Sequence, residues 1–171
     1  MKAYLRKRLG TAAWLRLAQF KYEMKVRRKI QFATDEISQH LEKLIHKHNG
    51  FYVEVGANDG RSSSNTYFLE KKYAWRGILI EPILHKHFES KIYRDPNSNK
   101  FVYGACVSEN YKSESIRLYY ANLMTSPDYG KGEEYANKGK TFLSNKEEVV
   151  PIWAPALTLK SITAESNITD R

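Results

Sequence analysis

The sequence has little cysteine, since Cys106 is the only one among 171 residues. A single cysteine cannot form a disulfide within the chain, and it cannot supply the ligands of a structural zinc site of the usual kind. Such scarcity is typical of proteins in a reducing compartment. We therefore expect a cytoplasmic protein without disulfides and without a bound metal ion.

The sequence also lacks a long apolar run. The longest candidate, residues 11–20, is interrupted by Arg16 and is shorter than the roughly 20 residues of a membrane-spanning helix. With 42% hydrophobic and 27% charged residues, the composition is that of an ordinary globular protein and excludes a disordered chain. The length is sufficient for one domain.

Acidic residues are almost absent from the first 30 positions, which hold ten Lys and Arg but only one acid, Glu23. The other 141 positions hold 18 residues of each sign. The net charge of +9 is therefore a property of the N-terminal segment. It gives no indication that the rest of the chain binds nucleic acid.

This segment, residues 1–34, is expected to form a basic helical extension. Its apolar residues, Trp14, Leu17 and Phe20 among them, do not keep one stripe at helical spacing. Peripheral contact of residues 1–30 with an anionic membrane is one interpretation, and packing on the domain or on a second copy is the other. A secretory signal fits poorly because Arg16 interrupts its apolar region, and an organellar presequence would contain more serine.

The remaining residues, 35–171, alternate apolar strands with helices. We expect helices at 35–48, 62–73 and 82–94, strands at 51–55, 77–81, 101–107 and 116–120, a polar loop at 122–148, an extended segment at 149–159 and a short last helix. The helix expected at 82–94 bears Leu84, Phe88 and Ile92. Apolar strands that alternate with helices are typical of a parallel sheet covered on both faces. The expected fold class is α/β with an open sheet.

The candidate site lies where the strands end, because ligands bind beyond the carboxyl ends of the strands in such sheets. Gly56 and Gly60 follow the first strand and permit a sharp turn and a close approach, and Asn58 tolerates unusual backbone angles. Glu81 ends the second strand, 25 residues after Gly56. Its carboxylate can accept hydrogen bonds from two ribose hydroxyls, so we expect a nucleotide-like ligand.

The spacing of the loop distinguishes two cofactor classes. Dinucleotide binding requires a middle glycine, which lets the pyrophosphate approach, and that position is occupied by Asn58. The loop instead resembles the first motif of methyltransferases that use S-adenosylmethionine, a cofactor without phosphate. A nicotinamide-dependent oxidoreductase is the alternative enzyme.

Residues 53–60, 64–66 and 75–82 together resemble the FkbM-type methyltransferase family. The likeness extends from Phe51 to Ile168, and residues 101–108 are similar to the third strand of that family. The resemblance implies a Rossmann-like enzyme that uses S-adenosylmethionine to O-methylate a hydroxyl of a sugar or other secondary metabolite. The acceptor itself is not implied.

The resemblance also implies roles for individual residues. It places Gly56, Asn58 and Gly60 at the methionine end of the cofactor, Glu81 on the ribose, Ala105 and Cys106 near the adenine, and Glu54 and Asp59 in secondary positions. The general base stays open among His85, His87 and Asp128, and residues 119–124 form either part of an acceptor pocket or a packed edge strand.

One part of the family pattern is missing. An apolar strand that leads into Asp-x-Glu-Gly is expected directly after Asp170, where the chain ends. We therefore expect residues 35–171 to be the N-terminal part of a methyltransferase domain with an incomplete sheet. A non-catalytic remnant that binds a membrane or a partner protein is the alternative outside the enzyme class.

Deleting residues 1–30 tests the membrane interpretation. The intact chain is expected to co-sediment with anionic vesicles and the deletion variant is not, because all of the excess positive charge lies in these residues. Higher salt should weaken binding of the intact chain, since exposed charges are screened within about 8 to 10 Å. Equal sedimentation of the two proteins would leave packing or dimerisation as the role of the segment.

Overall fold

The computed structural model describes residues 40–164 except 42, 46 and 145. All of them belong to the second of two units into which the chain divides, Met1–Gln31 and Phe32–Arg171. The extension expected at residues 1–34, most of the helix expected at 35–48, and residues 165–171 lie outside this description. Within the described part of the chain, no helix combines the length and the apolar character that crossing a membrane requires.

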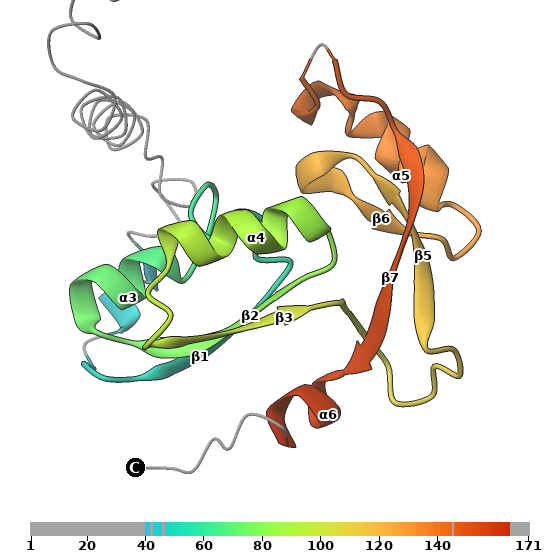
Figure 1. The fold of residues 1–171 in the computed structure, drawn as a ribbon. Helices are drawn as coiled ribbons and strands as arrows, with labels where there is room; N and C mark the ends of the chain where they lie inside the picture. Colours follow the sequence, from blue (N-terminus) through green and yellow to red (C-terminus); the bar gives the residue numbers. More distant parts are fainter. Residues whose placement is uncertain (1–39, 42, 46, 145, 165–171) are drawn as a thin grey trace, which may run out of the picture. The chain divides into compact units, whose positions relative to one another are not determined.

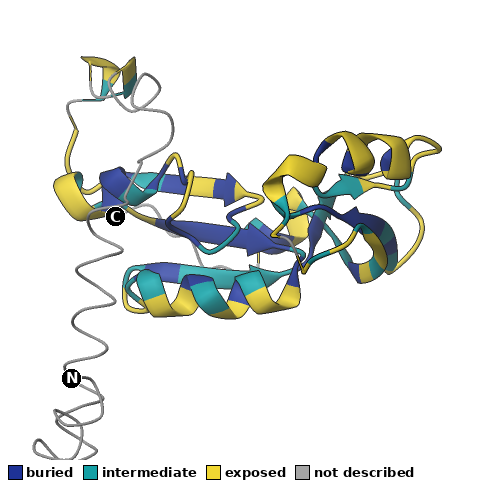
Figure 2. Cartoon of the chain, turned by 90° about the horizontal axis from the view of Figure 1, so that it is seen from above, coloured by how far each residue is buried: buried dark blue, intermediate teal, exposed yellow. Residues whose placement is uncertain are grey.

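The first sheet has three parallel strands in the order β1-β2-β3, as the alternation of strands and helices predicts. Its elements are β1 (Phe51–Val55), α3 (Tyr67–Tyr73), β2 (Arg76–Glu81), α4 (Leu84–Tyr93) and β3 (Asn99–Tyr103). Both helices lie on the same face of this sheet (Figure 1). The middle strand is enclosed almost completely at Ile78, Leu79 and Ile80, as expected for a parallel strand covered on both faces (Figure 2).

The second sheet has four strands in the order β4-β7-β5-β6. Its strands are β4 (Ala105–Val107), β5 (Ser115–Tyr120), β6 (Ser126–Pro127) and β7 (Val150–Thr158). β4 and β7 are parallel, whereas β7, β5 and β6 pair antiparallel. A core of Ala105, Ile116, Leu118 and Ala154 holds this sheet together.

Short helices occupy much of the segment that we expected to be a loop. They are η1 (Asn122–Met124), α5 (Gly132–Lys138) and η2 (Lys140–Phe142), and α6 (Leu159–Ala164) follows β7. α6 packs Ile162 against Ile78 and Ile80, on the face of the first sheet opposite α3 and α4 (Figure 1). The chain therefore returns from the second sheet to cover the first.

The prediction of a single strand at 101–107 is wrong, because the chain passes from the first sheet to the second at Gly104. β3 pairs with β2, whereas β4 pairs with β7. A Cβ atom on Gly104 would lie 2.8 Å from Leu157 Cδ1 and 3.0 Å from the Pro155 carbonyl oxygen. A larger residue would therefore require the Leu157 side chain and the neighbouring backbone of β7 to shift where the two sheets meet.

The extended segment expected near residue 150 is a nine-residue strand, β7, despite its two prolines. β5 pairs with residues 150–155 of β7, and β4 pairs with residues 156–158. Each part of β7 thus has one edge without a strand partner among the described residues. A strand tolerates proline at such an edge, because proline has no N–H to donate there.

The helix expected at 82–94 is present as α4, but its apolar face is not in the core. Leu84, Phe88 and Ile92 are 50%, 57% and 76% exposed. The residues of α4 that are buried are His87 and Ser90, and Arg94 follows them on the same side. The polar side of α4 faces inward because the partners of Arg94, Glu54 and Glu70, lie on that side.

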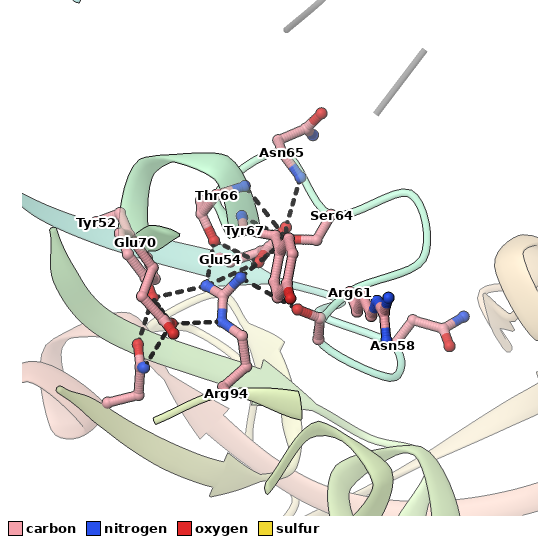
Figure 3. Close-up of polar contacts among 12 residues, drawn as sticks. Tyr52, Glu54, Asn58, Arg61, Ser64, Asn65, Thr66, Tyr67, Glu70 and Arg94 are labelled. Carbon is pink, nitrogen blue, oxygen red and sulfur yellow. Dashed lines mark hydrogen bonds and ion pairs between the residues drawn. The ribbon is translucent and has the colours of Figure 1, made fainter. Parts of the chain in front are cut away.

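Arg94 is the centre of a buried polar network (Figure 3). Its side chain is fully enclosed, with Nε 2.9 Å from Glu70 Oε2 and Nη2 3.9 Å from Glu54 Oε2. Nη2 also donates to the Tyr52 hydroxyl at 2.6 Å and to Thr66 Oγ1 at 2.7 Å. These contacts join α4 to β1 and α3. Burial raises the pKa of Tyr52, so its hydroxyl stays protonated and donates to Asn99 Oδ1.

The network also determines where α3 begins. We expected a helix from residue 62, but the first helical residue is Tyr67. Glu54 holds the intervening turn, because its carboxylate accepts hydrogen bonds from the hydroxyls of Ser64 and Thr66 and from the backbone N–H of Asn65. The backbone N–H of Tyr67, the first residue of α3, donates to Ser64 Oγ at 3.1 Å, so the turn bound by Glu54 leads directly into the helix.

Replacing Arg94 by methionine tests the network. Arg94→Met keeps much of the apolar stem but leaves the buried Glu54 without a cation and the buried Glu70 with only the exposed Lys71, so we expect the free energy of unfolding to fall by about 3–5 kcal/mol. The control is Arg117→Met, which removes a partly exposed ion pair to Asp128 at 3.6 Å and should cost at most about 1 kcal/mol. Urea unfolding measures both, and similar losses in the two variants would argue against the network.

Candidate functional site

The loop after β1 turns through three left-handed residues, as its sequence predicts. Gly56, Asn58 and Gly60 have φ angles of +73°, +50° and +73°. The backbone N–H of Gly56 donates to the carbonyl of Ile80 at 2.9 Å, so the loop closes over the end of β2. A Cβ atom on Gly60 would lie 2.9 Å from Ser90 Cβ, whereas one on Gly56 would meet nothing within 4 Å. Gly60 therefore serves packing, and Gly56 faces open space.

Glu81 holds this loop from the tip of β2. Its Oε2 accepts the backbone N–H of Asn58 at 2.6 Å, and its Oε1 accepts that of Ile83 at 2.7 Å. The side chain is buried, and burial raises the pKa of the carboxyl above its usual value although the two N–H groups act in the opposite direction. Each carboxylate oxygen has a second lone pair, so Glu81 can still accept hydrogen bonds from a ligand.

A cavity of about 280 Å³ opens beside this carboxylate, between the strand ends of the first sheet and the second sheet. Five of the residues expected in the site line it together: Gly56, Asn58, Glu81, Ala105 and Cys106. The second sheet and η1 complete the wall with residues that include Ile116, Leu118, Asn122, Leu123, Thr125 and Tyr129. The rule that ligands bind at strand ends thus correctly predicted that these residues, which are far apart in the sequence, lie at one place in the structure.

Three of the expected site residues lie outside the cavity wall. Glu54 is bound to the turn before α3 and to Arg94, as described above. Asp59 Oδ1 accepts the backbone N–H groups of Arg61 and Ser62, at 2.9 and 2.6 Å. Together with Gly60, these residues shape the loop instead of lining the space that it encloses.

Asn122 is the site residue that the sequence argument did not single out. Its Oδ1 accepts a hydrogen bond from Asn58 Nδ2 at 3.0 Å, and its own Nδ2 donates to the Phe142 carbonyl. Its φ angle of +53° is uncommon for a residue other than glycine. Residues 119–124 were considered for an acceptor pocket. Asn122 and Leu123 do line the cavity, whereas Tyr119 and Tyr120 are buried in the second sheet.

None of the three candidate bases lines the cavity. Asp128 pairs with Arg117 at 3.6 Å, and the ring of His85 lies 5.8 Å from that of Tyr120. His87 is buried beside Tyr103, and burial lowers the pKa of its imidazole.

In the part of the chain that the structure describes, no group of His, Cys, Asp or Glu side chains has an arrangement that could hold a metal ion.

The charge of the cavity wall restricts its ligands. Among the described residues that line it, Glu81 is the only charged one, and neither lysine nor arginine is present. A ligand phosphate would therefore find no cation, and it would lie near a carboxylate. A neutral or cationic ligand with hydroxyl groups is compatible with the carboxylate, the amides of Asn58 and Asn122, and the apolar wall.

The raised pKa of Glu81 predicts a pH dependence of stability. The folded protein binds the Glu81 proton more tightly than the unfolded chain, whose glutamate pKa is about 4.3. This contribution is full below that pH and is lost as the pH rises through the folded-state pKa. The free energy of unfolding of the wild type minus that of Glu81→Gln should thus decrease from pH 4 upward, and urea unfolding at several pH values measures it. A constant or rising difference would contradict the assignment.

No family model, no curated protein and no solved structure significantly matches this chain. The likeness to FkbM-type methyltransferases therefore rests on the motif residues of the loop and the strand ends, and what the cavity binds has to be argued from its chemistry.

Proposed function

We propose that the cavity binds S-adenosylmethionine and that the protein is a methyltransferase, or part of one, acting on a hydroxyl of a sugar or other secondary metabolite. One observation supports this above the others. The only charged side chain among the described residues of the cavity wall is the carboxylate of Glu81, at the tip of the strand that follows the glycine loop.

The sign of this charge separates the candidate cofactors. S-adenosylmethionine has a cationic sulfonium and a ribose with two free hydroxyls, and both are favourable near a carboxylate. A nicotinamide dinucleotide has a pyrophosphate, which usually binds at a glycine-lined helix N-terminus. Here the loop has Asn58 at the middle position, and α3 begins at Tyr67, well after the loop. The oxidoreductase is therefore the less favoured proposal.

The proposal assigns roles in cofactor binding to several residues of the cavity wall. Glu81 accepts hydrogen bonds from the ribose hydroxyls with the lone pairs that Asn58 and Ile83 leave free. Ala105 and Cys106, together with Ile116 and Leu118, form an apolar surface for the adenine. The backbone at Gly56 leaves space for the methionine end. When bound, S-adenosylmethionine supplies an electrophilic methyl group.

The acceptor is proposed to enter past Leu123 and Tyr129. Both side chains line the cavity and are also well exposed, at 45% and 66%. A cavity of about 280 Å³ is close to the lower limit of about 300 Å³ for ligand pockets, so the cofactor would fill most of it. An acceptor that stacks on Tyr129 at the opening would approach the methyl group without entering fully.

The Rossmann-like methyltransferase sheet is also part of the proposal. In the described part of the chain, β1 has one strand neighbour, β2, and its other edge is unpaired. Val53 and Val55 of β1 are 37% and 56% exposed, although parallel strands are usually covered on both faces. An additional parallel strand would pair the free edge of β1, and the helix that follows it would cover the face on which Val53 and Val55 lie, as the continuation of a methyltransferase sheet requires.

Isothermal titration of the full chain with S-adenosylmethionine and with NAD⁺ tests the proposal. We expect S-adenosylmethionine to bind and NAD⁺ not to bind. Glu81→Ala should weaken the binding of S-adenosylmethionine by about 1.5 to 3 kcal/mol, the range for hydrogen bonds to a charged group. The matched control is Glu109→Ala, an exposed glutamate outside the cavity, which should leave the affinity unchanged.

A second variant covers the case in which Glu81→Ala disturbs the loop. The side chain of Gly56→Val would extend into open space at the cavity, so it should abolish binding by steric exclusion while most secondary structure is kept. Circular dichroism checks the fold of each variant. Undiminished affinity in a folded Glu81→Ala protein would refute the ribose assignment, and binding of NAD⁺ alone would favour the oxidoreductase.

A further inference from the structure

Arg61 is a buried cation with no counter-ion among the described residues. It follows the glycine loop directly, and 7% of its surface is exposed. Every ion pair found between described residues involves other side chains, and Arg61 Nε is enclosed without a hydrogen-bond partner. Arginine is almost never buried unless it is paired, because a charge removed from water has to be compensated. Arg61 therefore lacks an anion.

The cations near Arg61 have carboxylate partners that compensate their charge. The ring of Tyr67 has three cations around it, with Arg61, Lys71 and Arg94 at 5.9, 5.4 and 5.5 Å from its centre. Lys71 is 2.6 Å from Glu70, and Arg94 pairs with both Glu70 and Glu54. Two carboxylates thus face three cations, and the unmatched charge is that of Arg61.

Asp59 does not neutralise Arg61. Its Oδ1 caps the loop by accepting the backbone N–H groups of Arg61 and Ser62. Among the described residues, no ion pair joins its carboxylate to the guanidinium of Arg61. The acid nearest in sequence is therefore engaged with the backbone.

The guanidinium of Arg61 is held in place but remains accessible at its end. Its central carbon lies 5.2 Å from the centre of the Tyr93 ring and 5.9 Å from that of Tyr67, so two aromatic side chains flank the guanidinium itself. Among the described residues, the enclosed nitrogens without a partner include Arg61 Nε but neither of its terminal nitrogens. These two nitrogens have no hydrogen-bond partner in the described part of the chain, so they face solvent.

We infer that Arg61, held by Tyr67 and Tyr93, is a binding site for an oxyanion, that is, for a carboxylate or phosphate group of a ligand. A planar guanidinium presents two parallel N–H groups that match two oxygens of such a group. The exposed residues Ser62 and Ser63 follow Arg61 in the sequence. Arg61 does not line the cavity at Glu81, so this site does not depend on the proposed function.

Thermal unfolding of the full chain in inorganic phosphate tests the inference, with sodium chloride at the same ionic strength as the reference. Phosphate at about ten times its dissociation constant should raise the unfolding temperature by about 3 to 5 °C. Arg61→Gln should lose this rise, and Arg117→Gln, which changes a partly exposed arginine that pairs with Asp128, should keep it. A parallel series with acetate distinguishes two kinds of site. Acetate should also raise the unfolding temperature if the site binds any oxyanion, and it should not if the site is selective for phosphate.

Arg61→Lys is the second variant. It keeps the charge but lacks the planar pair of donors, so most of the rise in phosphate should disappear while the protein stays folded. The inference is overturned if phosphate and acetate both leave the unfolding temperature of the wild type unchanged. It is also overturned if Arg61→Lys or a folded Arg61→Gln responds to phosphate as strongly as the wild type.

Discussion

The buried guanidinium of Arg94 is the constraint from which the first sheet and its loops follow. A charge with no exposure needs anionic partners, and Glu70 on α3 and Glu54 on β1 provide them. Arg94 Nη1 also donates to the carbonyl of Gly60, at 3.1 Å. One side chain therefore fixes both helices relative to the strands and holds the end of the glycine loop. Glu81 holds the middle of that loop through Asn58, so the loop is held by two buried charges of opposite sign.

The local part of this arrangement could be predicted from the sequence. β1 spans the expected residues, β2 begins one residue early, and the left-handed turns fall at Gly56, Asn58 and Gly60. These features depend on short-range properties such as apolar runs and residues that tolerate positive φ. The convergence of Glu81 and Ala105 on one cavity followed from the rule that ligands bind at strand ends.

The remainder depends on contacts between residues far apart in the sequence. Periodicity shows which residues of α4 share a face, but it does not show which face is inward. Leu84 and Phe88 would be the inward choice by hydrophobicity, yet Arg94 turns the other side toward the sheet because its partners lie 24 and 40 residues earlier. The strand β7 was missed for a similar reason. Its two prolines argue against a strand unless one knows that its partner changes between residues 155 and 156.

The loop after β1 separates two electrostatic environments. On the side of the cavity, Asn58 is bound to the carboxylate of Glu81, and no cation lines the wall in the described part of the chain. At the other end, Arg61 brings a positive charge to a surface formed by Tyr67 and Tyr93. Asp59 lies between them and binds the backbone N–H groups of Arg61 and Ser62, which keeps the loop in one conformation. The loop thus contributes its backbone to a cavity whose wall holds the carboxylate, whereas the guanidinium that follows the loop lies outside that wall. The two charges are therefore available to different ligand groups, hydroxyls or a cation at Glu81 and an oxyanion at Arg61.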